Sequence, residues 1–142
     1  MANVLIVDDQ SCIRSFLSEE LICEGYQVTS AGSRESLMGH LRSSNFDLVL
    51  LDLYLDGPDG FELLSTIKQE YPDLPVLVVT AYDSFADDPR LSKAAGYFVK
   101  STDLDPLKEK IADVLQRKEV RQAKVEDRPH IRLGSLASAP QT

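Results

Sequence analysis

A chain of 142 residues, 43% of them hydrophobic, has the size and apolar content of a single globular domain. Its formal net charge of −8 argues against a general nucleic-acid-binding surface and against attraction to anionic lipid, because both require basic residues. No apolar run approaches the length of a membrane span, and residues 1–7 lack the pattern of a signal peptide. We therefore expect a cytoplasmic protein without membrane contact.

Five short apolar runs have the length and composition of β-strands. The first, third and fourth are almost continuously apolar, as expected for central parallel strands that helices cover on both faces. The runs are Val4–Val7, Tyr26–Thr29, Phe46–Leu51, Val76–Thr80 and Tyr97–Val99.

Apolar residues at helical spacing lie between and after these runs. They predict helices around residues 13–21, 37–41, 61–71, 91–95 and 104–115. Pro89 suits the start of the short fourth helix, and Gly96 suits its end. Cys12 and Cys23 would stand about 16 Å apart on one helix, too far for a disulfide, so we expect reduced thiols buried on that helix.

Strand and helix alternate five times, which predicts an α/β fold. Short connections favour a parallel sheet with right-handed crossovers and helices on both faces, a doubly wound arrangement of five strands and five helices. We expect the folded domain to span residues 1–120. The charged stretch Lys118–Arg128 predicts a helical extension, and the Ser, Ala and Pro content that follows predicts that residues 121–142 form a tail with a flexible end and no output domain.

Polar residues stand where four of the strand runs end. Asp8 and Asp9 follow the first run, Asp52 follows the third, Thr80 closes the fourth and Lys100 follows the fifth. Each has an ordinary explanation alone, since aspartate caps helices and most lysines are solvated. In a doubly wound sheet, however, these ends meet at one edge, where the functional crevice lies.

Three carboxylates at one edge repel one another unless they are protonated or neutralised by a cation. Oxygen ligands in a partly open site suit Mg²⁺, which is usually shared with phosphate oxygens. A carboxylate beside Mg²⁺, an ammonium and a hydroxyl is suited to accept a phosphoryl group. We therefore expect Asp52 to be the phosphoacceptor, with Lys100 neutralising phosphoryl oxygens and Thr80 donating a hydrogen bond.

Together these residues resemble the receiver domain of response regulators in two-component and phosphorelay systems. The resemblance covers about residues 2–117 and implies the flavodoxin-like strand order 2-1-3-4-5 and a phosphoacceptor regulatory domain, not an enzyme. The matching positions are Val7–Asp9, Asp52, Asp59–Gly60, Thr80–Ala81, Ala95–Tyr97 and Lys100.

The resemblance implies a metal site. Asp9, Asp52 and the backbone carbonyl of Tyr54 would ligate Mg²⁺ directly, whereas Asp8 would act through metal-bound water. Gly60 has two interpretations, a bare turn residue or the family's landmark at the start of the third helix.

The resemblance also implies a switch. Lys100 would pair with the phosphoryl group and Thr80 would hydrogen-bond it, while the ring of Tyr97 would turn inward when Thr80 moves. An equally simple interpretation is that Tyr97 is a half-buried strand aromatic. Ala81 is small and would leave the phosphoryl group accessible.

Three features depart from the family pattern, namely Ser101 after Lys100, the turn at residues 55–59, and the late start of the fourth helix at residues 87–89. Ser101 follows Lys100 where the family usually has a proline with a cis peptide, so this connection is expected to be trans or strained. Tyr54 and Tyr82 stand where the family tunes hydrolysis of the acyl phosphate. Their bulk predicts slow hydrolysis, unless both rings turn outward and have no effect.

The resemblance implies a sensor histidine kinase as phosphoryl donor. After phosphorylation, the face formed by helix four, strand five and helix five would then control a partner protein or mediate homodimerisation. Alternatively, the phosphoryl group would pass to a histidine phosphotransfer protein. A second interpretation is the receiver end of a longer transcription regulator. A third, a flavodoxin-like redox protein or phosphoaspartyl hydrolase, is disfavoured because no Gly/Ser/Thr-rich phosphate loop follows the first strand.

Overall fold

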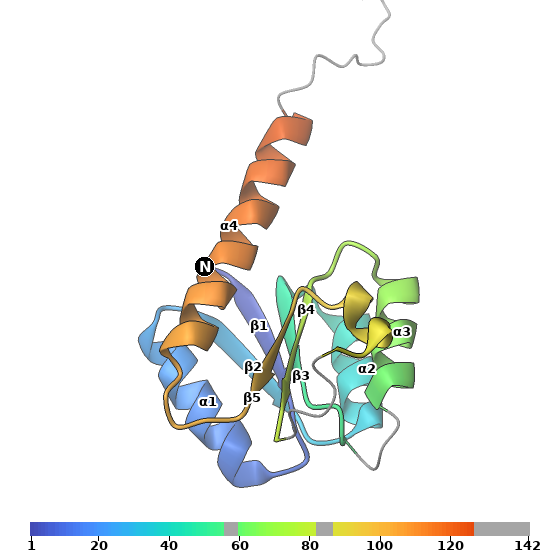
Figure 1. Ribbon diagram of the computed structural model, residues 1–142. Coiled ribbons are helices and arrows are strands. Elements are labelled where there is room, and N and C mark those ends of the chain that lie inside the picture. The colour runs from blue at the N-terminus through green and yellow to red at the C-terminus, as the bar shows by residue number, and fades with distance from the viewer. Residues whose placement is uncertain (56–59, 82–86, 127–142) are drawn as a thin grey trace, which may run out of the picture.

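The structure is a computed structural model that describes residues 1–55, 60–81 and 87–126. A five-stranded parallel sheet in the order β2-β1-β3-β4-β5 forms its centre (Figure 1). The predicted doubly wound fold and strand order are confirmed. The strands are β1 (Asn3–Val7), β2 (Gln27–Ala31), β3 (Leu48–Leu51), β4 (Val76–Thr80) and β5 (Gly96–Val99).

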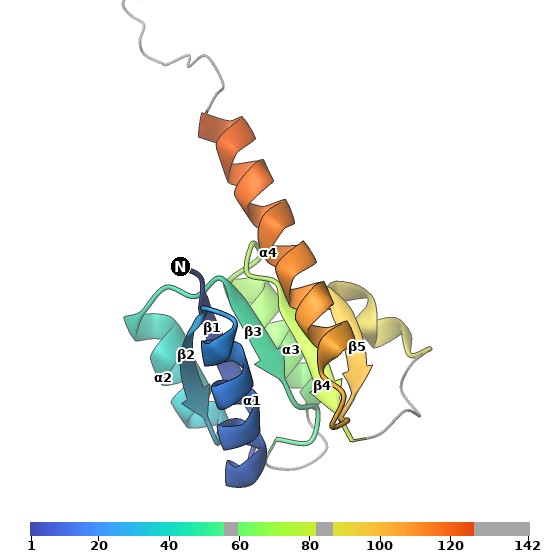
Figure 2. The same cartoon turned by 90° about the vertical axis from the view of Figure 1, so that its left-hand side faces the viewer.

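Helices cover both faces of the sheet, with α1 (Ser11–Cys23) and α4 (Asp105–Glu126) on one side and α2 (Arg34–Ser43) and α3 (Gly60–Glu70) on the other (Figures 1 and 2). Alternate strand residues point to opposite faces. In β1, Val4 and Ile6 pack toward α1 and α4, whereas Leu5 and Val7 pack toward α2 and α3. The sheet therefore separates two apolar cores.

The start of α3 depends on a glycine. A Cβ atom on Gly60 would overlap the backbone oxygen and the Cα atom of Leu53. Backbone cannot move aside as a flexible side chain can, so no larger residue fits at Gly60 without displacing α3 or the segment after β3. The glycine is therefore required by close packing at the start of α3.

Gly60→Ala should lower the free energy of unfolding by about 2 kcal/mol, because the added methyl overlaps buried backbone. Urea denaturation can measure this change. Gly39→Ala is the matched control, since a Cβ there meets no atom within 4 Å. Equal stability of the two variants would contradict the packing requirement.

The predicted short fourth helix begins at Pro89 as expected, but it is a 3₁₀ helix and not an α-helix. In the described residues, four α-helices are accompanied by one 3₁₀ turn, η1 (Pro89–Lys93), which begins with Asp88 accepting a hydrogen bond from the Arg90 N–H at 2.9 Å. Five residues are too few to stabilise an α-helix in isolation. Ala94 is already extended, and Gly96 begins β5 instead of ending a helix.

The prediction that both cysteines are buried is also wrong. Cys12 and Cys23 lie on α1 as expected, but both are exposed, because the helix turns Leu17 and Leu21 toward the sheet. The thiols therefore contribute little to the core.

The last helix, α4, continues past the sheet through Glu126 (Figures 1 and 2). Lys118 anchors its middle to the body through an ion pair with Asp47 at 3.3 Å, and Asp47 also accepts from the backbone N–H of Asn3 at 2.8 Å. Within the described ranges, no helix is both long enough and apolar enough to cross a bilayer. The end of the predicted tail, residues 127–142, lies outside the described residues.

Candidate functional site

The candidate site lies where the central strands end. The backbone N–H of Asp52 donates to the carbonyl of Val7 at 3.0 Å, and that of Lys100 donates to the carbonyl of Thr80 at 2.7 Å. These bonds continue the sheet's ladder one residue beyond the strands. They therefore bring residues from distant parts of the chain to the same edge, as the strand pattern predicts.

Three carboxylates gather at this edge. Asp8, Asp9 and Asp52 each offer an oxygen atom, and these atoms lie within 4.8 Å of one another. Asp8 and Asp52 are 2% and 5% exposed, whereas Asp9 is open to solvent. The donor set is all oxygen, with one open side, which fits a hard divalent cation such as Mg²⁺.

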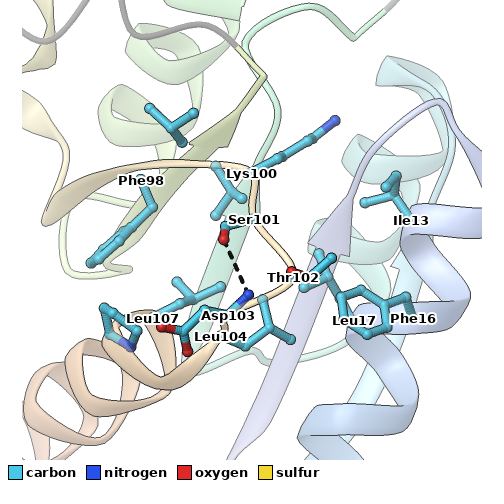
Figure 3. Close-up of a pocket in the computed structure, with 13 residues that line it drawn as sticks. Ile13, Phe16, Leu17, Phe98, Lys100, Ser101, Thr102, Asp103, Leu104 and Leu107 are labelled. Carbon is cyan, nitrogen blue, oxygen red and sulfur yellow. Dashed lines mark hydrogen bonds between the residues drawn. The ribbon is translucent and has the colours of Figure 1, made fainter.

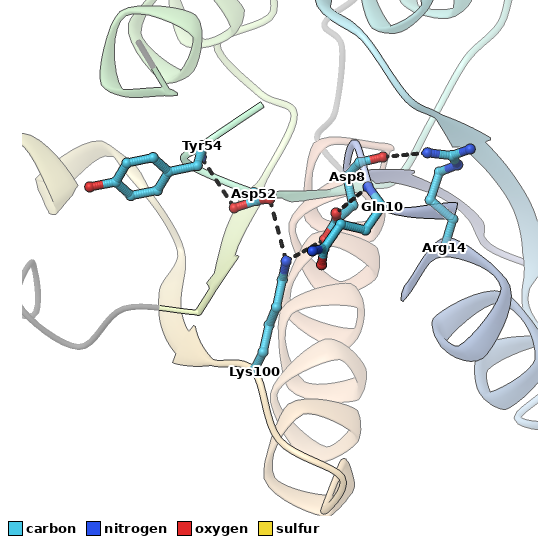
Figure 4. A network of polar contacts seen from close by, with 6 residues as sticks. All are labelled: Asp8, Gln10, Arg14, Asp52, Tyr54 and Lys100. Atoms are coloured by element: carbon cyan, nitrogen blue, oxygen red, sulfur yellow. Dashed lines mark hydrogen bonds and ion pairs between the residues drawn. The ribbon is translucent and has the colours of Figure 1, made fainter. Parts of the chain in front are cut away.

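Lys100 connects two of the carboxylates. Its Nζ lies 2.7 Å from Oδ2 of Asp8 and 3.4 Å from Oδ2 of Asp52 (Figure 4). Burial alone lowers the pKa of the Lys100 ammonium, but the hydrogen bond and charge of Asp8 and the charge of Asp52 outweigh burial and raise it. Lys100 is therefore a fixed cation at neutral pH.

Asp52 experiences the opposite balance. Burial raises the pKa of its carboxyl group above the ordinary value, and the charge of Asp8 raises it further. The N–H of Tyr54, which donates to Oδ1 at 3.1 Å, and the ammonium of Lys100 lower it without restoring the ordinary value. Because three carboxylates share this edge with the single ammonium of Lys100, the cluster keeps a net negative charge.

Thr80 supplies an unpaired hydroxyl. Its side chain is fully buried, and its Oγ1 has no hydrogen-bond partner within the described part of the chain. A buried hydroxyl without a partner costs free energy, and such atoms commonly mark the place of a ligand. Beside the acidic cluster, this donor suits an anionic oxygen.

Two of the three aromatic residues named in the prediction lie within the described residues. The ring of Tyr54 points away from the Asp52–Lys100 contact and packs against the core beneath α2 and α3 (Figure 4). Tyr97 lies on β5 opposite Val78, half-buried against the same core. The Tyr54 carbonyl as a metal ligand and Tyr97 as a switch stay predictions, and Tyr82 and Asp59 lie outside the described residues.

A pocket of about 450 Å³ opens between α1 and the segment that follows β5 (Figure 3). Its walls are mainly apolar, and two of the side chains that line it, Phe16 and Val99, are exposed to solvent. Ser101 stands in this segment and accepts a hydrogen bond from the Asp103 N–H at 3.1 Å. Lys100 also lines this pocket, but its ammonium points away from it (Figure 3). The pocket therefore adjoins the charged site and shares this lysine with it.

Sequence reasoning missed three contacts of the site. It assigned Lys100 to the phosphoryl group and did not anticipate its ion pairs with Asp8 and Asp52. It also gave no role to Arg14, whose Nη1 donates to the backbone oxygen of Asp8 at 2.7 Å. No spacing rule reports a side chain that reaches back from a helix to a strand end.

Comparison with known families decides the class of the protein. Residues 4–112, which include every residue of the site, match the response regulator receiver domain. The chain belongs to this family. Receiver domains are regulatory signalling domains, so the predicted class is confirmed.

Curated relatives of this receiver domain are longer proteins. The heme response regulator HssR of Staphylococcus epidermidis is 34% identical over 84% of this chain, which corresponds to 54% of HssR. The DNA-binding transcriptional regulator NtrC of Rhizobium meliloti is 34% identical over 89% of this chain and 26% of its own length. The chain thus spans about half, or less, of the curated relatives described here.

Solved receiver structures share the fold. The response regulator TrrA of Thermotoga maritima, in complex with Mg²⁺-BeF, is 37% identical over 80% of this chain and 99% of its own, with a TM-score of 0.76. TrrA was also solved in complex with the histidine kinase ThkA. A CheY-like receiver domain from Methanospirillum hungatei is 28% identical over 85% of this chain and 98% of its own, with a TM-score of 0.79.

Proposed function

We propose that this receiver domain is a phosphorylation switch in which Asp52 accepts a phosphoryl group from the phosphohistidine of a sensor histidine kinase. The observation that carries the proposal is the cluster of Asp8, Asp9 and Asp52, two of which pair with the Lys100 ammonium. The unpaired hydroxyl of Thr80 lies at the same edge of the sheet. The complexes of TrrA with Mg²⁺-BeF and with ThkA support both the metal and the donor.

Mg²⁺ fits the donor set of the site. Asp8, Asp9, Asp52 and the backbone carbonyl of Tyr54 would hold it, and it would neutralise the carboxylates and the phosphoryl oxygens during transfer. Burial, and then the charge of Asp8, raises the pKa of Asp52 although Lys100 lowers it, so a further cation at the site would favour its ionised form.

The residues of the chain would divide the chemistry. A carboxylate oxygen of Asp52 bonds to phosphorus as the bond from phosphorus to the histidine nitrogen breaks, and the imidazole leaves with those electrons. Lys100 attracts the phosphoryl oxygens, and Thr80 donates its unused hydrogen bond. No general base is needed, because a carboxylate nucleophile carries no proton that must be removed during the attack. Movement of Thr80 would then reach Tyr97 through the paired strands β4 and β5.

Beryllofluoride, a phosphoryl mimic, tests this account without a kinase. On addition of beryllofluoride to ¹⁵N-labelled protein already saturated with MgCl₂, we expect the amide resonances of Asp52, Thr80 and Tyr97 to shift. The same addition to Asp52→Asn should leave them in place. Equal shifts in both proteins would contradict the assignment of Asp52.

The kinase is proposed to dock over the apolar pocket beside the site. Consider a histidine kinase that phosphorylates the wild-type chain. Phe16→Ala should slow phosphotransfer from this kinase about tenfold, because exposed aromatic residues dominate many interfaces. Acetyl phosphate needs no docking surface and should phosphorylate this variant at the wild-type rate. Ile22→Ala, an exposed apolar residue of α1 outside the pocket lining, is the control. Equal slowing with both phosphoryl donors would place the defect in the site instead of the docking surface.

What the phosphorylated form controls is a separate part of the proposal. In one version of the proposal, residues 1–120 with a tail form a stand-alone switch in the cytoplasm. This switch acts on a partner, on a second copy or on a histidine phosphotransfer protein. The receiver end of a longer transcription regulator is the other version, and the greater length of HssR and NtrC favours it. The reading frame beyond Thr142 separates the two versions. The redox and hydrolase alternatives gain no support from the family match.

A further inference from the structure

Arg14 makes a contact that the proposed phosphoryl chemistry does not use. From the first turns of α1, its Nη1 donates a hydrogen bond to the backbone carbonyl of Asp8 at 2.7 Å (Figure 4). A guanidinium donor makes this bond shorter and stronger than a neutral one. The side chain therefore ties α1 to the end of β1.

Gly32 makes room for this guanidinium. A Cβ atom at Gly32 would lie 2.8 Å from Nη1 of Arg14 and 3.2 Å from its Cζ, closer than unbonded atoms normally approach. Just before this glycine, the carbonyl of Ala31 accepts from the N–H of Asp8 at 3.1 Å. Both backbone polar groups of Asp8 are thus held, one by β2 and one by the arginine that lies against Gly32.

The bonded carbonyl belongs to the peptide unit that joins Asp8 to Asp9. Because a peptide unit is planar, fixing its oxygen also fixes the direction in which the chain enters Asp9. The Asp8 carboxylate is held separately, by the N–H of Gln10 at 2.9 Å and by Lys100 at 2.7 Å. Asp9 is exposed, so its place in the cluster depends more strongly on the orientation of its backbone.

We propose that Arg14 is a positioning residue for the carboxylate cluster, which acts through the Asp8–Asp9 peptide, and that Gly32 provides the space this requires. The inference rests on the proposed function, because the ligand concerned is Mg²⁺. Groups that orient metal ligands from outside typically change metal affinity 10–100-fold when removed.

Titration of ¹⁵N-labelled protein with MgCl₂, followed by NMR, tests the proposal through the Kd for the metal alone. Arg14→Met should raise this Kd about tenfold. If Arg14 acted only as a nearby charge, its removal would instead strengthen cation binding, because one repelling cation is lost. The two roles therefore predict opposite signs. A purely structural role would lower the melting temperature in Mg²⁺-free buffer without raising the Kd.

Gly32→Ala provides a second test that leaves every charge in place. Its methyl group should displace the guanidinium and raise the Kd for Mg²⁺ as Arg14→Met does. Since both changes remove the same contact, the Kd of the double variant for Mg²⁺ should be no higher than the higher of the two single-variant Kd values. Gly39→Ala, at a position with open space, should leave the Kd unchanged.

Three results would overturn the inference. They are a Kd for Arg14→Met at or below that of the wild type, an unchanged Kd for Gly32→Ala, and losses that add in the double variant. The proposed function fails separately, if wild-type protein shows no saturable response to MgCl₂. A normal wild-type titration with unaffected variants contradicts the role of Arg14 alone.

Discussion

Lys100→Met is expected to lower the free energy of unfolding by about 3 kcal/mol in Mg²⁺-free buffer. The ammonium lies 2.7 Å from Asp8 and 3.4 Å from Asp52, and both aspartates are almost fully buried. Removal of the shared cation leaves two carboxylates in a poorly solvated place with nothing to neutralise them. Methionine fills a similar volume, so the loss reports charge and not a cavity.

Urea denaturation of both proteins in the presence of EDTA measures this effect. Lys108→Met is the matched control, because Lys108 also makes a 2.8 Å ion pair, with Glu20, but with a partner that is 40% exposed. Surface pairs contribute less than about 1 kcal/mol. Saturating MgCl₂ should reduce the loss in Lys100→Met, since a bound dication again neutralises the cluster. A loss no larger than that of Lys108→Met would show that the cluster is not short of positive charge.

Asp52→Asn is expected to have the opposite effect on stability while it abolishes phosphorylation. The raised pKa of Asp52 means that folding disfavours its ionised form, chiefly through burial and then through the charge of Asp8. An amide removes that charge, so the metal-free variant should be more stable than the wild type at pH 7. It also lacks the carboxylate nucleophile that phosphoryl transfer requires.

The stability gain in Asp52→Asn has a defined dependence on pH. In the wild type, the penalty is absent below the unfolded-state pKa of about 3.9, where Asp52 is protonated in both states, and it develops as pH rises through the higher folded-state pKa. Urea denaturation in Mg²⁺-free buffer should therefore show the largest gain near neutral pH and almost none near pH 3.5. A stability gain of the same size at both pH values would mean that the gain comes from packing and not from charge.

Much of the site can be predicted from the sequence, because parallel strands carry the residues after them to one edge. Asp8, Asp52, Thr80 and Lys100 are all found there for that reason. A run of apolar residues reports a buried strand, and the next polar residue reports its end. This is local information, which a single sequence contains in full.

Other features depend on which surfaces meet in three dimensions. The exposure of Cys12 is set by which side of α1 faces the sheet. The helical pattern after Pro89 becomes a 3₁₀ turn, because the chain must return within a few residues to form β5. The Arg14–Asp8 and Lys100–Asp8 contacts join residues whose separation follows no helical or strand period. Such pairs can be found only once the fold is known.

Intact-mass measurement after incubation with acetyl phosphate and MgCl₂ tests the central claim most directly. The wild-type chain should gain the mass of one phosphoryl group. It should show no such gain when EDTA replaces MgCl₂ during the incubation. Asp52→Asn should gain nothing under either condition. A phosphoryl group on Asp52→Asn in the same yield as on the wild type, or a wild-type chain that stays unmodified although it binds Mg²⁺, would contradict the assignment of Asp52 as the phosphoacceptor.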